Sequence, residues 1–227
     1  MVPQHVGFII DGNRRWAAKH GKSVFEGHRQ GVLRAREIAR YCIDRGVKVA
    51  SFYGFSTENW NRSAKEVSDL MGLFEWTATE LFSELIELGA QVRHLGKLAS
   101  LPASLRRAIK RVIQTSKHNK KFILNIALNY GGQDEIVRAI RKLLKSGPKP
   151  SQVNEQQLAK LLDTGDLPPV DLVIRTSGTH RLSNFLIWQS AYAELYFADT
   201  VFWPDFSPAE FDKALIWYSQ QKRNFGK

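Results

Sequence analysis

Near the amino end, a short apolar run leads directly into a carboxylate, a glycine, an amide and two arginines. The run covers residues 6–10, and the polar residues after it are Asp11, Gly12, Asn13, Arg14 and Arg15. A helix starting there presents free backbone N–H groups, which together with arginines favour a bound phosphate. Asp11 by itself fits a metal ligand, a nucleophile or a helix cap. Two arginines oppose the dipole of a helix start, so an anion bound beside them is the better explanation.

A second apolar run, residues 172–174, leads into another group of anion-binding side chains. Arg175, Arg181 and Ser183 place two guanidinium groups and a hydroxyl within nine residues, a set that suits a diphosphate. Glu194 follows among aromatic and apolar residues, where an unpaired carboxylate is costly to bury. We therefore expect Glu194 either in an ion pair or in a metal site that it shares with Asp11.

Two further segments carry polar side chains of less specific meaning. His28 stands between glycines in E-G-H-R-Q-G, where a purely structural histidine is the alternative to a ligand-binding one. Residues 54–62, G-F-S-T-E-N-W-N-R, follow an apolar run and precede a long helical pattern. The first polar residues of this segment are common turn formers, whereas a tryptophan and an arginine are less expected in a simple turn. The candidates are Ser56, Thr57, Glu58, Asn59, Trp60 and Arg62.

The elements that must position these residues alternate between strand-like and helical patterns, which predicts an α/β fold. Strands are expected at residues 6–10, 47–55, 91–94, 122–127 and 172–174. One long helix is expected over 63–88, stopped by Gly89, and a last helix over 208–222 with Ser207 as its cap. We predict a single domain, residues 1–227, with a mainly parallel central sheet flanked by helices. The ligand crevice then opens at the carboxyl ends of the strands, where both polar clusters begin.

Composition and charge narrow the class of protein. The 227 residues carry a formal charge of +11, and no acidic residue occurs between positions 88 and 133. This basic stretch fits a solvated face or a membrane surface, and it fits RNA less well because no aromatic residues are interleaved with the cations. No apolar run is long enough to span a membrane. The single cysteine, Cys42, excludes an internal disulfide and fits a reducing cytoplasm.

Five sequence blocks resemble the cis-prenyltransferases, the isoprenyl or undecaprenyl diphosphate synthases, in the order expected for that family. The blocks are H-V-G-F-I-I-D-G-N-R-R-W-A (5–17), G-F-S-T-E-N-W-N-R (54–62), A-L-N-Y-G-G (127–132), I-R-T-S-G-T-H-R-L-S-N-F-L-I-W-Q-S-A-Y-A-E-L-Y-F (174–197) and W-P-D-F (203–206). The resemblance covers nearly the whole chain. The phosphate-binding P-loop, the G-x-S-x-G elbow and the D-D-x-x-D signature of trans-prenyltransferases are all absent from the sequence, which agrees with it.

The resemblance implies a homodimeric transferase that condenses isopentenyl diphosphate onto an allylic diphosphate, with Mg2+ as cofactor and a hydrophobic tunnel for the growing chain. It implies that Asp11 and Glu194 bind the metal, and that Asp11 and Asn59 act in catalysis. The residues that it implies for substrate binding are Gly12, Asn13, Arg14, Arg15, Trp16, His28, Ser56, Thr57, Glu58, Trp60, Arg62, Arg175, Arg181, Leu182 and Ser183.

The expected product is undecaprenyl diphosphate, made from farnesyl diphosphate for a cell-wall lipid carrier. A shorter-chain synthase and a non-catalytic partner subunit of the same fold are the alternatives. We expect a cytoplasmic protein with transient membrane-surface contact and no nucleic-acid partner. Three positions depart from the family pattern: Val24 and Asn224 replace arginines, and Thr179 replaces a glutamate. These changes are expected to remove phosphate contacts and a carboxylate close to the metal.

Overall fold

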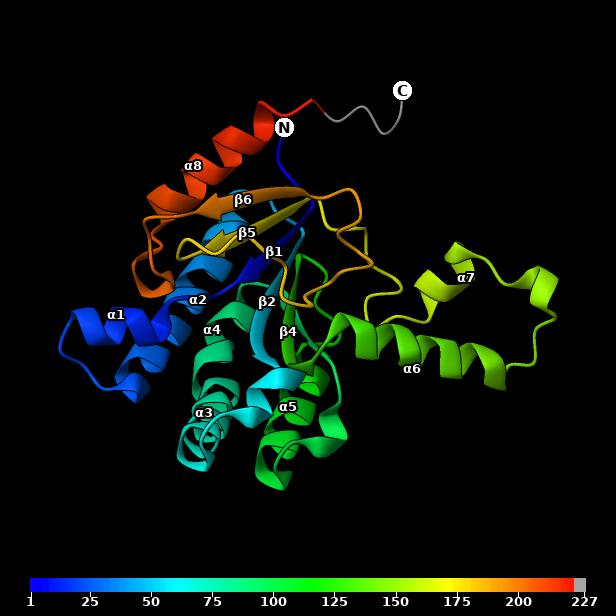
Figure 1. The fold of residues 1–227 in the computed structure, drawn as a ribbon, viewed down its shortest axis with the longest axis horizontal. Helices are drawn as coiled ribbons and strands as arrows, with labels where there is room; N and C mark the ends of the chain where they lie inside the picture. The colour runs from blue at the N-terminus through cyan, green and yellow to red at the C-terminus, as the bar shows by residue number, and fades with distance from the viewer. Residues whose placement is uncertain (223–227) are drawn as a thin grey trace.

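The centre of the molecule is one sheet of six parallel strands. A computed structural model describes residues 1–222, in which the strand order is β3-β4-β2-β1-β5-β6. The strands are β1 His5–Ile9, β2 Val49–Ser56, β3 Ala90–Leu95, β4 Phe122–Tyr130, β5 Leu172–Thr176 and β6 Glu194–Ala198 (Figure 1). Each of the five pairings is parallel, which confirms the predicted α/β fold with its sheet flanked by helices.

Helices connect the strands and cover the sheet. Their bounds are α1 Asn13–Lys19, α2 Val24–Asp44, α3 Ala64–Trp76, α4 Phe82–Glu87, α5 Ala103–Ser116, α6 Gly132–Lys145, α7 Glu155–Lys160 and α8 Pro208–Ser219. The side chain of Ser207 accepts a hydrogen bond from the backbone N–H of Glu210, which confirms the predicted cap of the last helix. That helix ends three residues before the predicted position 222. Asn224 lies outside the described residues.

The prediction of one long helix over 63–88 is confirmed in extent, because helical residues run without a break from Ala64 to Glu87, but the middle of this segment is not an α-helix. Between α3 and α4, residues Thr77–Leu81 form a π-helix. The hydroxyl group of Thr77 donates a hydrogen bond to the carbonyl of Leu73 at 2.7 Å, and that of Thr79 donates to Glu75. Such side-chain bonds compete with the α-helical ladder, and single π turns of this kind recur at functional sites. The apolar stripe used for the prediction does not distinguish an α turn from a π turn.

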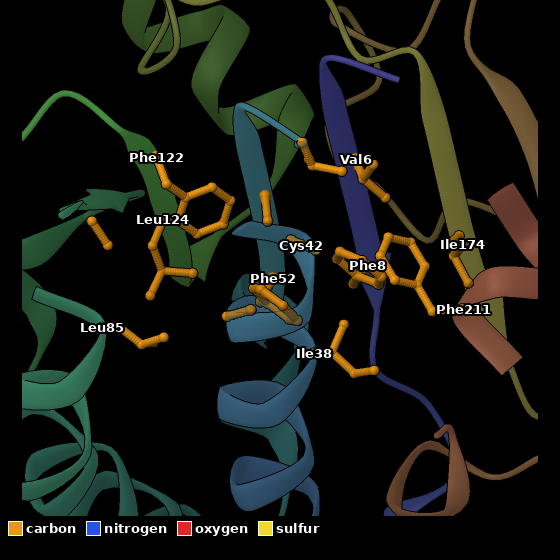
Figure 2. Close-up of a cluster of buried hydrophobic side chains, with 14 of the residues drawn as sticks. Val6, Phe8, Ile38, Cys42, Phe52, Leu85, Phe122, Leu124, Ile174 and Phe211 are labelled. Atoms are coloured by element: carbon orange, nitrogen blue, oxygen red, sulfur yellow. The ribbon is translucent and has the colours of Figure 1, made fainter. Parts of the chain in front are cut away.

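The main core lies on the face of the sheet that α2, α4 and α8 cover. Phe8 of β1 and Phe52 of β2 stack with their ring centroids 4.7 Å apart, and Phe211 of α8 contacts Phe8 edge-on at 5.5 Å. Figure 2 shows these rings beside Ile38 and Cys42 of α2, both fully buried. Burial of these aromatic side chains removes a large apolar area from water, which makes the sheet a rigid base for the residues at its edge.

The sixth strand was missed in the sequence. Of residues 194–198, only Glu194 was given a role, as a metal ligand, and no strand was predicted there; these residues form β6, an edge strand that pairs with β5. Glu194 pairs with Leu172, and Leu172 with Val6, so Glu194 lies level with the beginning of β1. The short, half-exposed strand has little of the apolar alternation on which strand prediction depends.

The strand order fixes where a ligand can bind. β1 lies between β2, which follows it in the chain, and β5, which belongs to the other half of the sheet. Strand order reverses at this point, and in open parallel sheets the crevice at such a point binds the ligand. Ile9 pairs with Arg175, so the polar residues after β1 and those at the end of β5 meet at one edge.

Candidate active site

A cleft of about 610 Å3 opens at the carboxyl ends of β1, β2 and β5. It gathers side chains from segments far apart in the sequence. Ten of the predicted site residues line it, namely Asp11, Asn13, His28, Ser56, Glu58, Asn59, Arg62, Arg175, Arg181 and Ser183. The expectation that the two polar clusters meet at one sheet edge is therefore confirmed by the geometry.

Asp11 is held between two arginines. Its Oδ2 accepts a hydrogen bond from Arg175 Nη2 at 2.8 Å, and its Oδ1 accepts one from Arg15 Nη2 at 3.3 Å. Its backbone carbonyl accepts from the hydroxyl of Thr176 at 2.6 Å and from the backbone N–H of Trp203 at 3.0 Å. The main chain at Asp11 is thus fixed from two sides, while its carboxylate, 30% exposed, faces the cleft.

Gly12 allows the sharp change of direction between β1 and α1. Its φ is 105°, a value that residues with a side chain rarely adopt. A Cβ placed there meets Phe202 at 2.9 Å and Ser177 at 3.0 Å. The glycine does not itself line the cleft; it brings Asp11 close to Ser177 and the end of β5.

Arg175 is the most deeply buried cation of the site. Its side chain is 5% exposed, and its Nη1 donates to the hydroxyl of Ser183 at 2.8 Å and to the carbonyl of Arg181. Its Nε has no hydrogen-bond partner among the described residues. A buried donor without a partner costs free energy, and a bound anion would remove that cost. This cluster is therefore suited to one end of a diphosphate.

Glu66 of α3 gathers two arginines and a histidine on the other side of the cleft. Its carboxylate lies 3.1 Å from Arg62, 3.4 Å from His28 and 3.8 Å from Arg14. Burial lowers the pKa of His28, and the hydrogen bond with Glu66 partly offsets that effect. The imidazole is therefore neutral near pH 7 and available as a hydrogen-bonding group.

The segment after β2 is held by its own side chains. Asn59 Oδ1 accepts from the backbone N–H of Ser56 at 3.1 Å, and Asn184 Nδ2 donates to Glu58 Oε1 at 3.1 Å. The second bond joins this segment to the loop after β5, so both walls of the cleft are tied together. Asn184 and Tyr53 line the cleft as well, and sequence reasoning missed both. Asn184 directly follows the predicted residue Ser183, whereas no feature of the sequence distinguishes Tyr53 from the other residues of β2.

Several predicted substrate-binding residues lie around the cleft rather than in its lining. Trp16 donates its indole N–H to Asp205 at 2.7 Å, and Trp60 donates to Asn129 at 2.8 Å. Arg14 instead lines an adjoining cavity of about 350 Å3, together with Val24. The predicted residues outside the main lining are Gly12, Arg14, Arg15, Trp16, Thr57, Trp60 and Leu182.

The expectation that Asp11 and Glu194 share a metal within one chain is wrong. Glu194 begins β6, level with Val6, whereas Asp11 follows the far end of β1. At about 3.3 Å per strand residue, their positions differ by about 16 Å along the sheet. Among residues 1–222, no group of three or more acidic, histidine or cysteine side chains is placed to cage a metal ion.

Apolar cavities continue from the cleft toward the interior. One, of about 60 Å3, shares Ile10, Val32, Gly54 and Phe74 with the cleft lining. The next, of about 30 Å3, lies beyond it against α5. Phe74 borders the cleft and both small cavities. These small cavities adjoin the cleft at Phe74, on the side where a hydrocarbon would enter the interior, and the continuous hydrophobic tunnel stays a prediction.

Comparison with known proteins agrees with this geometry. The family model of undecaprenyl diphosphate synthase matches residues 9–226. An isoprenyl transferase of Aquifex aeolicus is 43% identical, with 100% of this chain and 96% of that protein covered. A ditrans,polycis-undecaprenyl-diphosphate synthase (farnesyl-diphosphate specific) of Pasteurella multocida is 45% identical, with 99% and 95% covered.

Among solved structures, the lavandulyl diphosphate synthase of Lavandula x intermedia, in complex with dimethylallyl diphosphate, superimposes with a TM-score of 0.95. It is 34% identical, and the match covers 100% of this chain and 99% of that one. Sequence blocks, sheet topology and cleft therefore lead to the same assignment. The chain belongs to the undecaprenyl diphosphate synthase family and is a cis-prenyltransferase.

Proposed function

We propose that this chain condenses isopentenyl diphosphate onto farnesyl diphosphate with cis double-bond formation, giving undecaprenyl diphosphate for a cell-wall lipid carrier. The observation that carries the proposal is the pair of Asp11 and buried Arg175 in a cleft that continues into apolar cavities. Cationic donors at the mouth suit diphosphates, and dry space behind them suits a hydrocarbon. The name of the Pasteurella multocida relative supports the primer and the product.

The roles of the residues follow from their positions. Arg175, Arg181 and Ser183 bind isopentenyl diphosphate at the β5 side of the cleft. Asn13, His28 and Arg62, with the neighbouring α1 arginines, hold the allylic diphosphate at the α3 side. Fixed guanidinium groups stabilise the negative charge that grows on the leaving diphosphate as its bond to carbon breaks. A proton is lost when the new carbon–carbon bond forms; the released diphosphate is the base that takes it, and Asn59 positions the reacting groups at the cleft wall.

The cleft offers a carboxylate as a ligand for Mg2+. Mg2+ in proteins commonly takes one or two carboxylates and completes its shell with water and substrate phosphates. Asp11 offers such a carboxylate at the cleft wall, and we propose it as the protein ligand. When bound, the ion would neutralise charge on the leaving diphosphate. Arg175 and Arg15 orient the carboxylate for that purpose.

A shorter-chain product is the second candidate. It is favoured by the close superposition with lavandulyl diphosphate synthase and by the small cavities beyond Phe74. Radiolabelled isopentenyl diphosphate with farnesyl diphosphate and Mg2+, followed by product sizing, separates the two. A ladder ending at 55 carbons supports the long product, and termination after one or two additions supports the short one. If no product is longer than the primer when Mg2+ is present, the enzymatic proposal fails.

We further propose that the enzyme is a cytoplasmic homodimer that touches the membrane transiently to deliver its lipid product. None of the helices within residues 1–222 is long and apolar enough to cross a membrane. Delivery would therefore depend on a surface contact. Sedimentation equilibrium measures the dimer directly, and cell fractionation tests the location.

A further inference from the structure

One face of the molecule carries a group of cations that no acidic side chain neutralises. Arg93 and Lys97, in the acid-free stretch, pair with Asp166 and Asp134 from other elements. Arg106 is half-buried and donates to the carbonyl of Ala99. The cations after it are all exposed, and none forms an ion pair with a carboxylate in the described part of the chain. They form the α5 basic face: Arg107, Lys110, Arg111, Lys117, Lys120 and Lys121.

The helical repeat of α5 places its basic residues and its buried residues on opposite sides of the helix. Leu105, Ile109 and Val112 of α5 are buried, and they lie on the side of the helix opposite Arg107 and Arg111. Glu75 of α3 accepts a hydrogen bond from the hydroxyl of Ser104 at 2.7 Å, at the start of α5 and away from its basic residues in the later turns. Arg107 and Arg111 therefore project away from the core, and neither has an ion-pair partner among residues 1–222.

The inner side of the same helix borders the hydrocarbon route. Ile109 and Val112 line the last apolar cavity, together with Phe74 and Phe82. In Figure 1, α5 lies next to α3, away from α6 and α7. A helix is about 10 Å across with its side chains, so the basic face lies about one helix thickness from the cavity.

We propose that the α5 basic face docks on an anionic phospholipid bilayer, an inference that rests on the proposed function because a lipid diphosphate must reach a membrane. Clustered Lys and Arg are attracted to the negative surface potential of such a bilayer. No Phe, Tyr or Trp occurs between residues 103 and 121, so the face lacks platforms on which single-stranded RNA bases would stack. A basic surface without aromatic residues therefore favours an anionic lipid surface over single-stranded RNA.

The test is vesicle co-sedimentation of the full chain without substrate. One variant carries Arg107→Glu, Lys110→Glu and Arg111→Glu on α5. The matched control carries Arg141→Glu, Lys145→Glu and Lys160→Glu on α6 and α7, which changes the net charge equally at another face. Vesicles contain phosphatidylglycerol and phosphatidylcholine in equal parts, or phosphatidylcholine alone.

The unmodified chain should bind the anionic vesicles, and added salt should weaken binding. Each cation near an anionic surface contributes about fivefold to partitioning, so the α5 variant should bind at least about 100-fold less tightly. The control should remain within about threefold. Equal losses in both variants, equal binding to neutral vesicles, or tighter binding to single-stranded RNA than to anionic vesicles would each overturn the inference.

A solution assay separates this inference from the proposed function. Both variants should fold, as judged by thermal melting, and should elongate farnesyl diphosphate at the rate of the unmodified chain when no vesicles are present. Vesicle binding lost with turnover intact in the α5 variant supports the docking face. Absence of turnover in the unmodified chain contradicts the proposed function, whatever the vesicles show.

Discussion

Arg175 Nη2 donates a hydrogen bond of 2.8 Å to Asp11 Oδ2, and this contact joins the carboxyl ends of β5 and β1 across 164 residues of sequence. The arginine is almost fully buried, whereas the carboxylate is partly open to the cleft. A buried ion pair of this kind is weak evidence for stability, because desolvation offsets much of its attraction. Its position at the mouth of the cleft fixes the direction of the Asp11 carboxylate, the group that we propose as the metal ligand.

Asp11→Asn should lower kcat for isopentenyl transfer by about 10³, because the amide removes the negative ligand and leaves the shape nearly unchanged. Initial rates with radiolabelled isopentenyl diphosphate measure the effect. Asp205→Asn is the matched control, since Asp205 accepts from Trp16 outside the cleft lining. If the two variants lose similar activity, Asp11 has no special role in the reaction.

Gly12→Ala should lower the free energy of unfolding by about 3 kcal/mol, because a side chain at a φ of 105° is strained and its Cβ meets Phe202 and Ser177. Gly21→Ala is the control, with a φ of 61° and nothing within 4 Å of the added atom. That variant should lose about 1 kcal/mol. Urea unfolding compares them. Similar losses would show that the close approach at Gly12 is unimportant.

Glu66→Gln should raise the KM for the allylic substrate about tenfold with kcat within about threefold, because Arg62 and His28 lose the charged partner that orients them. The pKa of His28 should also fall further, since Glu66 opposes the effect of burial. Steady-state kinetics and NMR titration measure these changes. The control is Glu37→Gln, which removes an exposed partner of Arg34 and should leave the KM for the allylic substrate and the pKa of His28 unaltered. If Glu66→Gln lowers kcat and leaves KM unchanged, Glu66 is not a positioning residue.

Much of the fold was predictable because hydrophobic periodicity reports burial. The five predicted strands match β1 to β5 closely, since buried parallel strands read as continuous apolar runs. β6 was missed because it is a five-residue edge strand, E-L-Y-F-A, whose side chains are mostly partly exposed, so the sequence shows no regular alternation of apolar and polar residues. The π-helix was missed because its cause is a set of hydroxyl-to-carbonyl bonds at Thr77 and Thr79, which leave the spacing of apolar residues intact.

The site was predictable where a motif adjoined a strand end. Asp11 and Arg175 follow apolar runs, and parallel strands bring such positions to one edge. Glu66 was missed because its role depends on two arginines and a histidine from three segments, which only the tertiary structure brings together. The pairing of Glu194 with Asp11 was wrong for a related reason: strand register, rather than residue type, decides which end of the sheet a carboxylate occupies.

His5 lies at the opposite end of β1 from the site, in a buried polar network. Its Nδ1 lies 2.9 Å from the carbonyl of Pro168, so Nδ1 carries the proton, and its Nε2 accepts from the hydroxyl of Ser51 at 2.7 Å. Asn125 in turn donates to Ser51 at 2.8 Å. The hydrogen bond from Ser51 to Nε2 requires a neutral imidazole, and burial lowers the pKa of His5 to about 4.

The lowered pKa of His5 makes stability depend on pH. Between pH 6.5 and about 4, the unfolded chain binds a proton that the folded chain does not, so the free energy of unfolding falls as pH falls. From pH 7.5 to pH 5, His5 should account for a loss of about 2 kcal/mol. His5→Gln removes this titration, so its urea unfolding should lose about 2 kcal/mol less than that of the unmodified chain over the same interval. Equal losses in the two proteins would mean that the imidazole is protonated, or absent from the network, in the folded state.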